Sequence, residues 1–400
     1  MKILHSISKA ISTVGAVIYN QFRLVFHDAG ALIFFLGLPL LYPIVYTLIY
    51  NPEVVEKVAV AVVDDSRSAE SRHLVQTASA SPTIDIFDYA NDMAEARDMM
   101  HRGEVFGIMY IPSDYGTQVA RGEQANVSFY SNVALLLRYR ALAFALTDLQ
   151  MHLASEITQA KISNYGLESL SSGGMPINTD ANFLGDTEQG FASFVMPGIL
   201  VLILQQSMLL GIALIEGSSN ERRRKNHGID PQMVRGASAT ESVIGKGLCY
   251  FLLYIPITIY VLRIVPWMFK LPQWGDPTQY LLFIVPLLLA SAMFGLALGP
   301  LMKERENGFI LLVATSIVFL FLSGLTWPRY GMADVWVWIG NLIPAVWGVE
   351  GFIRINSNSA TLAQNSHPYI MMWVLTVAYA LLAIGIHKFR RYRQARQVAS

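Results

Sequence analysis

The stretch VLILQQSMLLGIALIEGSSNERRRKNHGID, residues 201–230, places a long apolar run just ahead of four consecutive cations, Arg222 to Lys225. An apolar run of about 20 residues is long enough to cross the ~30 Å hydrocarbon core of a bilayer. Lys and Arg near the end of such a run are typical of its cytoplasmic side. The stretch therefore predicts a membrane helix that leads into a basic segment.

The composition of the whole chain agrees with a membrane protein. Of its 400 residues 53% are hydrophobic and 14% are charged, whereas soluble domains carry about 25% charged residues. Six runs are long enough to span a bilayer: residues 29–50, 194–215, 244–264, 279–300, 308–326 and 369–387. The first run is too long for the apolar part of a signal peptide. We predict an α-helical polytopic membrane protein with six transmembrane helices.

The distribution of cations predicts the orientation. With a cytoplasmic N-terminus, residues 1–28, 216–247, 301–307 and 388–400 are cytoplasmic and hold 16 Lys and Arg residues, against four in the short outer loops. All seven tryptophans lie in or beside those outer loops, as in an aromatic belt at one interface. Both termini are therefore predicted to be cytoplasmic.

Three segments outside the spans have patterns of their own. Residues 1–28 carry apolar side chains at steps of three and four, which predicts a helix lying in the membrane interface. Residues 327–352 are apolar, but Pro and Gly divide them into pieces too short to cross, which favours re-entrant or interfacial helices. Residues 388–400 form a basic tail behind the transmembrane domain 194–387.

Residues 51–193 are a polar insert between the first two spans. Strand patterns such as VAVAVVDDS and TIDIFDYA alternate with helical patterns, which predicts an inserted α/β domain on the extracytoplasmic side. Asn91 is a candidate N-cap for one of its helices. The insert has 19 acidic and 9 basic residues, a formal charge of −10. Residues 171–190, rich in Gly, Ser, Asn and Asp, resemble a tether.

No familiar catalytic or cofactor motif is present in the sequence. The eight histidines show no metal-ligand spacing, and the single cysteine, Cys249, allows no intramolecular disulfide. The stretch TESVIGKG approaches a phosphate loop, but Thr240 replaces its first glycine and Gly247 its magnesium-binding Ser or Thr. We therefore predict no ATP hydrolysis, no covalent chemistry and no cofactor in this chain.

Two polar or small-residue features lie inside the predicted spans. Gln205, Gln206 and Ser207 are consecutive in the middle of the second span; they are either interhelical hydrogen-bonding groups or one wall of a substrate path. Gly295 and Gly299 form a G-x-x-x-G motif, which serves either helix packing within the chain or a contact between two copies.

The basic cluster has three interpretations. It is a topology determinant, a nucleic-acid patch, or part of a docking site for a partner. The net charge of zero and the lack of neighbouring aromatic residues argue against nucleic acid. The other two interpretations stay open on residue patterns alone.

Taken with these patterns, the chain resembles a known family, the membrane subunit (permease) of ATP-binding-cassette type-2 exporters, and most closely the bacterial drug-type members with a large extracytoplasmic domain. The family's loop after the second span typically begins with Glu and basic residues and ends in a Glu and a Gly-Lys. The matching residues here are Glu221, Arg222, Arg223, Arg224, Glu241 and Lys246. In mid-loop this chain has His227-Gly228, where members usually have Gly-Thr.

A second stretch also resembles the family. FLSGLTWPRYGMADVWVWIGNLIPAVWGVEGF is similar to its Ser-Gly…Pro…Pro signature, which is carried here by Ser323, Gly324, Pro328 and Pro344.

The resemblance implies a division of labour. A separate cassette ATPase subunit would bind MgATP, and residues 217–246 would couple that subunit to the spans. A second permease chain, as homodimer or paralogue heterodimer, would complete a pathway for efflux of a hydrophobic or amphipathic substrate (drug, lipid or peptide). The resemblance also implies the bacterial inner membrane, and a periplasmic adaptor is a further candidate partner.

Two rival functions remain open at this point. One is a non-transporting membrane receptor or secretion accessory protein with the same fold. The other is a membrane-embedded enzyme, which the absence of catalytic motifs disfavours.

Overall fold

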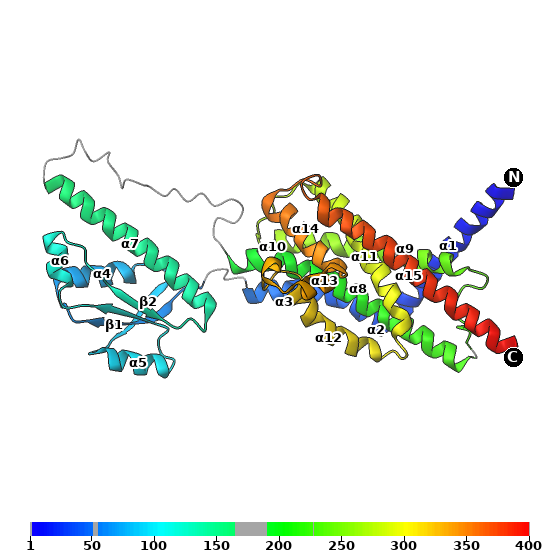
Figure 1. Ribbon diagram of the computed structural model, residues 1–400, viewed down its shortest axis with the longest axis horizontal. Helices are drawn as coiled ribbons and strands as arrows, with labels where there is room; N and C mark the ends of the chain where they lie inside the picture. The colour runs from blue at the N-terminus through cyan, green and yellow to red at the C-terminus, as the bar shows by residue number, and fades with distance from the viewer. Residues whose placement is uncertain (1, 51–54, 165–189, 227, 400) are drawn as a thin grey trace. The chain divides into compact units, whose positions relative to one another are not determined.

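The computed structural model describes residues 2–50, 55–164, 190–226 and 228–399, and Figure 1 shows its helices and strands. The chain divides into two compact units. We call Met1–Asn51 with Phe183–Ser400 the helical unit and Pro52–Asn182 the inserted unit. The inserted unit occupies most of the segment 51–193, and the expected tether lies outside the described residues except for Gly190.

The inserted unit is a sheet covered by helices. Its described elements are β1 (Val58–Asp64), α4 (Ala69–Ser79), β2 (Ile84–Tyr89), α5 (Met93–His101), β3 (Gly107–Ile111), α6 (Tyr115–Arg121), β4 (Ser128–Ser131) and α7 (Leu136–Asn164). The strand order is β2-β1-β3-β4; β1 pairs in parallel with β2 and β3, and β4 is antiparallel to β3.

The central strand β1 supplies both faces of this sheet. Val60 and Val62 pack on one side with residues of α4 and α7, while Ala61 and Val63 pack on the other side with α5. Figure 1 shows α4 and α7 over one face and α5 over the opposite face. Alternate residues of a strand point to opposite faces, so one buried strand holds two apolar layers together.

The N-cap of α5 corrects the sequence interpretation. Asp92, not Asn91, is the cap, and its carboxylate accepts a hydrogen bond from the Glu95 amide at 2.8 Å. Asn91 instead donates its backbone and side-chain N–H groups to the Glu95 carboxylate. The misassignment by one residue arose because Asn and Asp are equally good caps.

The helical unit begins with α1 (Lys2–His27), followed by a first span built from α2 (Ala29–Leu32), the π-helical η1 (Ile33–Gly37) and α3 (Leu38–Tyr50). The remaining described elements are α8 (Phe191–Lys225), α9 (Ala239–Ile259), η3 (Tyr260–Ile264), α10 (Val265–Met268), α11 (Pro277–Leu298), η4 (Gly299–Leu301), α12 (Asn307–Leu322), η5 (Arg329–Gly331), α13 (Asp334–Asn341), α14 (Pro344–Asn358) and α15 (Ser366–Ala399). In Figure 1, α1 and the end of α15 extend from the same end of this unit.

Within the described residues, five helical segments are long and apolar enough to cross a membrane: Ala29–Tyr50, Phe191–Lys225, Ala239–Met268, Pro277–Leu301 and Ser366–Tyr392. They correspond to five of the six predicted spans. The sixth, predicted at 308–326, is α12, whose 16 residues extend about 24 Å at 1.5 Å per residue. It falls short of the ~30 Å core. Between the predicted bounds of the re-entrant segment, α13 and α14 meet at a 90° bend.

Helix α8 is the centre of the helical unit. In its most apolar 18-residue window 94% of the residues are buried, compared with 22% in Ala29–Tyr50 and in Ser366–Tyr392. It packs against α3, α11, α12 and α14. A helix that is apolar on all sides is expected to be an internal one, and α8 has this position.

The two glycines of the G-x-x-x-G motif bring α11 close to α8. A Cβ atom at Gly295 would lie 2.8 Å from the Ile212 side chain, and one at Gly299 would lie 2.7 Å from Glu216. Real Cβ atoms do not approach so closely. The motif therefore serves packing within the chain, which confirms one of its two interpretations.

Candidate functional site: the junction of α8 and α9

The basic cluster is helical rather than part of a loop. Arg222, Arg223, Arg224 and Lys225 form the last turn of α8, and Asn226 follows as its C-cap. The expected loop 217–246 thus consists of two helix ends joined by a connecting segment, whose described residues are 226 and 228–238. Cations in the last turn of a helix interact favourably with its dipole.

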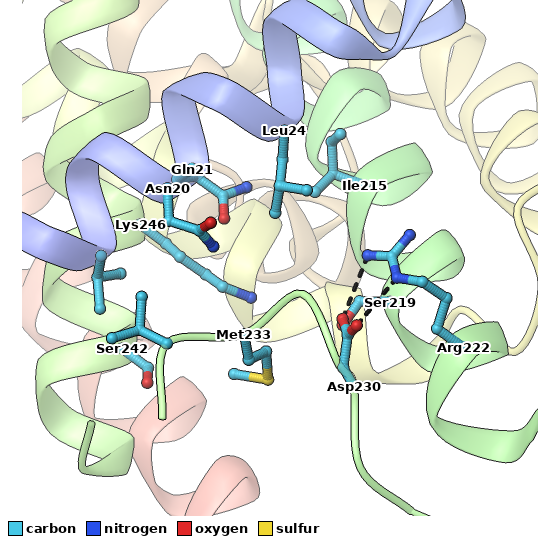
Figure 2. A pocket seen from close by; sticks show the side chains of 12 residues that line it. Asn20, Gln21, Leu24, Ile215, Ser219, Arg222, Asp230, Met233, Ser242 and Lys246 are labelled. Carbon is cyan, nitrogen blue, oxygen red and sulfur yellow. Dashed lines mark hydrogen bonds and ion pairs between the residues drawn. The ribbon is translucent and has the colours of Figure 1, made fainter. Parts of the chain in front are cut away.

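A buried carboxylate fixes the connecting segment to the end of α8. The two oxygens of Asp230 accept hydrogen bonds from Arg222 Nε at 2.9 Å and from the Ser219 hydroxyl at 2.6 Å. Figure 2 shows Arg222 hydrogen-bonded to Asp230 beside a small cavity that both residues line together with Lys246. Burial acts to raise the pKa of Asp230, but the hydrogen bonds from Arg222 and Ser219 outweigh it and the pKa is lowered. Asp230 therefore stays ionised at neutral pH.

Helices from both ends of the chain also hold this segment. From α1, Asn20 Nδ2 donates to the Gln232 carbonyl at 2.8 Å. From α15, Arg391 donates to the Ala237 carbonyl at 2.7 Å. Ile229, in contrast, leaves 72% of its surface exposed. The backbone of the segment is thus anchored while an apolar side chain faces outward.

Lys246 lies in the interior of the helical unit. Its ammonium donates to the Glu216 carboxylate, and the two side chains are 7% and 2% exposed. The pair joins α8 to α9, and His387 of α15 is buried nearby. A role for Lys246 at the membrane surface, where a long side chain would snorkel, does not fit this position.

The two flanking glutamates have different surroundings. Glu241 forms a capping box: its carboxylate accepts from the Ser238 amide at 2.7 Å, and the Ser238 hydroxyl accepts from the Glu241 amide at 3.2 Å. Glu221 lies 3.6 Å from Lys225 one turn along α8, with 38% of its side chain exposed. Glu241 thus stabilises the start of α9, whereas Glu221 remains accessible.

A second ion pair joins the break between α1 and α2 to the segment before α12. Arg305 donates to both oxygens of Asp28, at 2.7 and 2.5 Å. Burial acts to raise the pKa of Asp28, yet the hydrogen bonds from Arg305 and the Ala31 amide, together with the charge of Arg305, outweigh it and the pKa is lowered. Asp28 also caps α2 through the Ala31 amide. Sequence reasoning missed Asp28, Asp230 and Glu216, although Asp28 and Glu216 stand directly beside apolar runs and Asp230 follows the basic cluster by five residues.

The polar triplet within α8 separates into two groups. The Ser207 hydroxyl accepts a hydrogen bond from Tyr254 of α9 at 3.0 Å, so it joins two helices. In the part of the chain that the structure describes, the side-chain amides of Gln205 and Gln206 have no hydrogen-bond partner. Gln205 is only 2% exposed. An unpaired amide in an apolar interior is costly, so a polar partner for these two side chains would have to come from outside the described residues.

The four signature residues shape the chain around α12 and α14. Ser323 is the C-cap of α12, and Gly324 follows it with a φ of +85°. Pro344 is the first residue of α14. Together with Pro328, Ser323 and Gly324 line a cavity of about 610 Å³.

On the described residues, no group of three or more His, Cys, Asp or Glu side chains is placed to hold a metal ion.

These features define a multi-pass membrane protein built on one buried helix, with an ion-paired junction at the end of that helix. The sequence model of the family described as "ABC-2 family transporter protein" matches residues 30–384, and the chain belongs to this family. It is similar to ABC transporter G family member 20 of Dictyostelium discoideum, with 23% identity over 265 residues. That alignment covers 65% of this chain and 34% of the relative, so the chain spans about a third of the relative's length.

Proposed function

We propose that this chain is the permease subunit of an ATP-binding-cassette exporter. The observation that carries the proposal is the family match over residues 30–384 of a chain with several span-capable helices. In the proposed complex a separate cassette ATPase hydrolyses MgATP, and two permease chains form the pathway. The transported substrate is a hydrophobic or amphipathic molecule such as a drug, lipid or peptide.

The proposed topology has both termini in the cytoplasm and the inserted unit outside, in the inner membrane of a bacterium. The excess of cations in residues 1–28, 216–247 and 388–400 supports it. The arrangement of α1 and α15, which extend from the same end of the helical unit, is also consistent with it.

The ATPase is proposed to dock on the α8–α9 junction. Its connecting segment is anchored through Asp230, so the segment itself loses little conformational freedom when a partner binds there. Ile229, Glu221 and Arg235 provide an accessible apolar side chain and accessible charges on this surface. A rigid backbone with mixed outward side chains can transmit movement of a partner to α8 and α9.

The test is co-purification of the ATPase with the permease, together with ATP hydrolysis by the complex. We expect Glu221→Ala and Ile229→Asp to weaken association without loss of permease expression. Loss of a charge contact that becomes desolvated in the complex costs about 2–5 kcal/mol, whereas an exposed pair at the rim costs about 0.2–1 kcal/mol. Glu56→Ala, an exposed acid in the inserted unit, is the matched control. If both junction variants retain the ATPase as well as the control does, docking at this surface is wrong.

Gln205 and Gln206 are proposed as part of the substrate path. Their unpaired amides, on the most buried helix, support a role in contacting a polar group of the substrate. Replacement of each by Leu removes the unpaired amide at similar size. We expect Gln205→Leu to alter which substrates stimulate ATP hydrolysis while leaving basal hydrolysis intact.

A further inference from the structure

The inserted unit contains a groove that the proposed permease function does not use. It has a volume of about 410 Å³ and lies between α7 and the segment that joins α6 to β4. Ligand sites in proteins commonly measure about 300–1,000 Å³. The groove is therefore large enough for a small organic molecule, and it lies wholly within the inserted unit.

The floor of the groove is apolar and incompletely covered. Leu74 and Leu149 are buried beneath it, whereas Val119, Leu146 and Leu153 are only partly buried. These partly buried aliphatic side chains pack against the apolar core of the unit and converge in one concavity, and ligand pockets are lined mostly by apolar side chains. This floor would take the apolar part of a ligand.

The polar groups of the groove favour a positive charge. Glu123 is the acidic lining residue, and none of the described lining residues is Lys or Arg. The rings of Tyr115 and Phe129 also line the groove, and aromatic faces attract ammonium-type cations. The surrounding unit adds to this preference, since residues 52–182 hold 17 acidic against 9 basic residues, a formal charge of −8.

We propose that this groove binds a cationic amphiphile, with its apolar body on the aliphatic floor and its charge near Glu123 and the aromatic rings. The inference deepens the proposed function, because it names a class of substrate, and its transport role rests on that function. The binding itself does not depend on the ATPase.

The test uses the full chain in lipid nanodiscs and two probes of matched size, tetraphenylphosphonium and tetraphenylborate, with binding to empty nanodiscs subtracted. We expect saturable binding of the phosphonium cation and none of the borate anion. Glu123→Gln should weaken cation binding about fivefold, the equivalent of one accessible charge contact. Thr147→Trp, at an exposed position on the rim, should block the groove for steric reasons.

Asp98→Asn is the control, because Asp98 is an exposed acid on α5, which covers the other face of the sheet. It should bind the cation as the native chain does. Equal binding of both probes, unchanged cation binding in Thr147→Trp, or no saturable cation binding at all would each overturn the proposal. Failure of the ATPase to co-purify would instead count against the permease function and leave this result standing.

Discussion

The Lys246 ammonium donates to the Glu216 carboxylate between α8 and α9, and both side chains are buried. Two adjacent helices are therefore joined by a charged contact at the end of the unit where the proposed ATPase would act. Removal of one partner leaves the other charge buried and unpaired, which is strongly destabilising. A change of both partners to apolar residues leaves no buried charge and so no such desolvation penalty.

A double-mutant cycle on this pair is expected to be strongly non-additive. Glu216→Leu or Lys246→Met alone should lower the free energy of unfolding by about 3–5 kcal/mol, since each leaves a buried charge without its counterion. The double variant should recover most of that loss. Thermal unfolding of the purified chain in detergent measures all three. Losses that simply add would show that the pair contributes nothing as a pair.

Glu241 gives a prediction that separates helix capping from partner docking. Glu241→Gln keeps an acceptor for the Ser238 amide, while Glu241→Ala removes it. If capping is its role, the Ala variant loses thermal stability and the Gln variant matches the native chain in stability and in ATPase association. Loss of the ATPase from a fully stable Gln variant would instead assign the carboxylate charge to docking.

Asp230 predicts a pH dependence with a definite sign. Its pKa is lowered from the ordinary 3.8, so its contribution to stability is fully present above that pH and is lost only as the pH falls through the lower folded value. The protection factors of the amides in residues 228–238, which are exchange rates corrected for the intrinsic pH dependence of amide exchange, should thus be equal at pH 5 and pH 8. Asp230→Asn should speed exchange there at both pH values.

Arg222→Lys is the matched variant, because Lys keeps the charge but cannot reproduce the two-pronged contact of the guanidinium. We expect intermediate exchange. Protection factors in the native chain that fall steeply between pH 8 and pH 5 would contradict the ion pair as the anchor.

The sequence predicted the spans better than it predicted their ends. Apolar runs locate the helices, but the run that stops at Ile215 continues as helix for ten more residues to Lys225. Tertiary contacts explain the extension: Asn220 donates to the Met302 carbonyl at 2.7 Å. Such a contact links residues 82 positions apart, so local hydropathy carries no signal for it.

The short α12 has a signal in the sequence that the run length concealed. The predicted span 308–326 contains Gly324, whose φ of +85° ends the helix just after Ser323. Glycine is the usual residue in this left-handed position after a helix. The Lys246–Glu216 pair could likewise have been suspected, because Glu216 directly follows one apolar run and Lys246 is the third residue of the next.

The proposed topology predicts opposite accessibility of two engineered cysteines. Cys249 is buried and can be changed to Ala, which leaves a cysteine-free chain. Ala94, on the exposed side of α5, and Asn226, at the exposed end of α8, are suitable positions for single cysteines. In intact cells an impermeant thiol reagent should label Ala94→Cys and leave Asn226→Cys unlabelled, and permeabilisation should expose both. The exposure of both positions in the folded chain makes the comparison fair, since neither is hidden by packing.

Labelling of Asn226→Cys but not Ala94→Cys in intact cells would reverse the orientation. It would also place the α8–α9 junction on the side of the membrane where no ATP-hydrolysing partner can reach it.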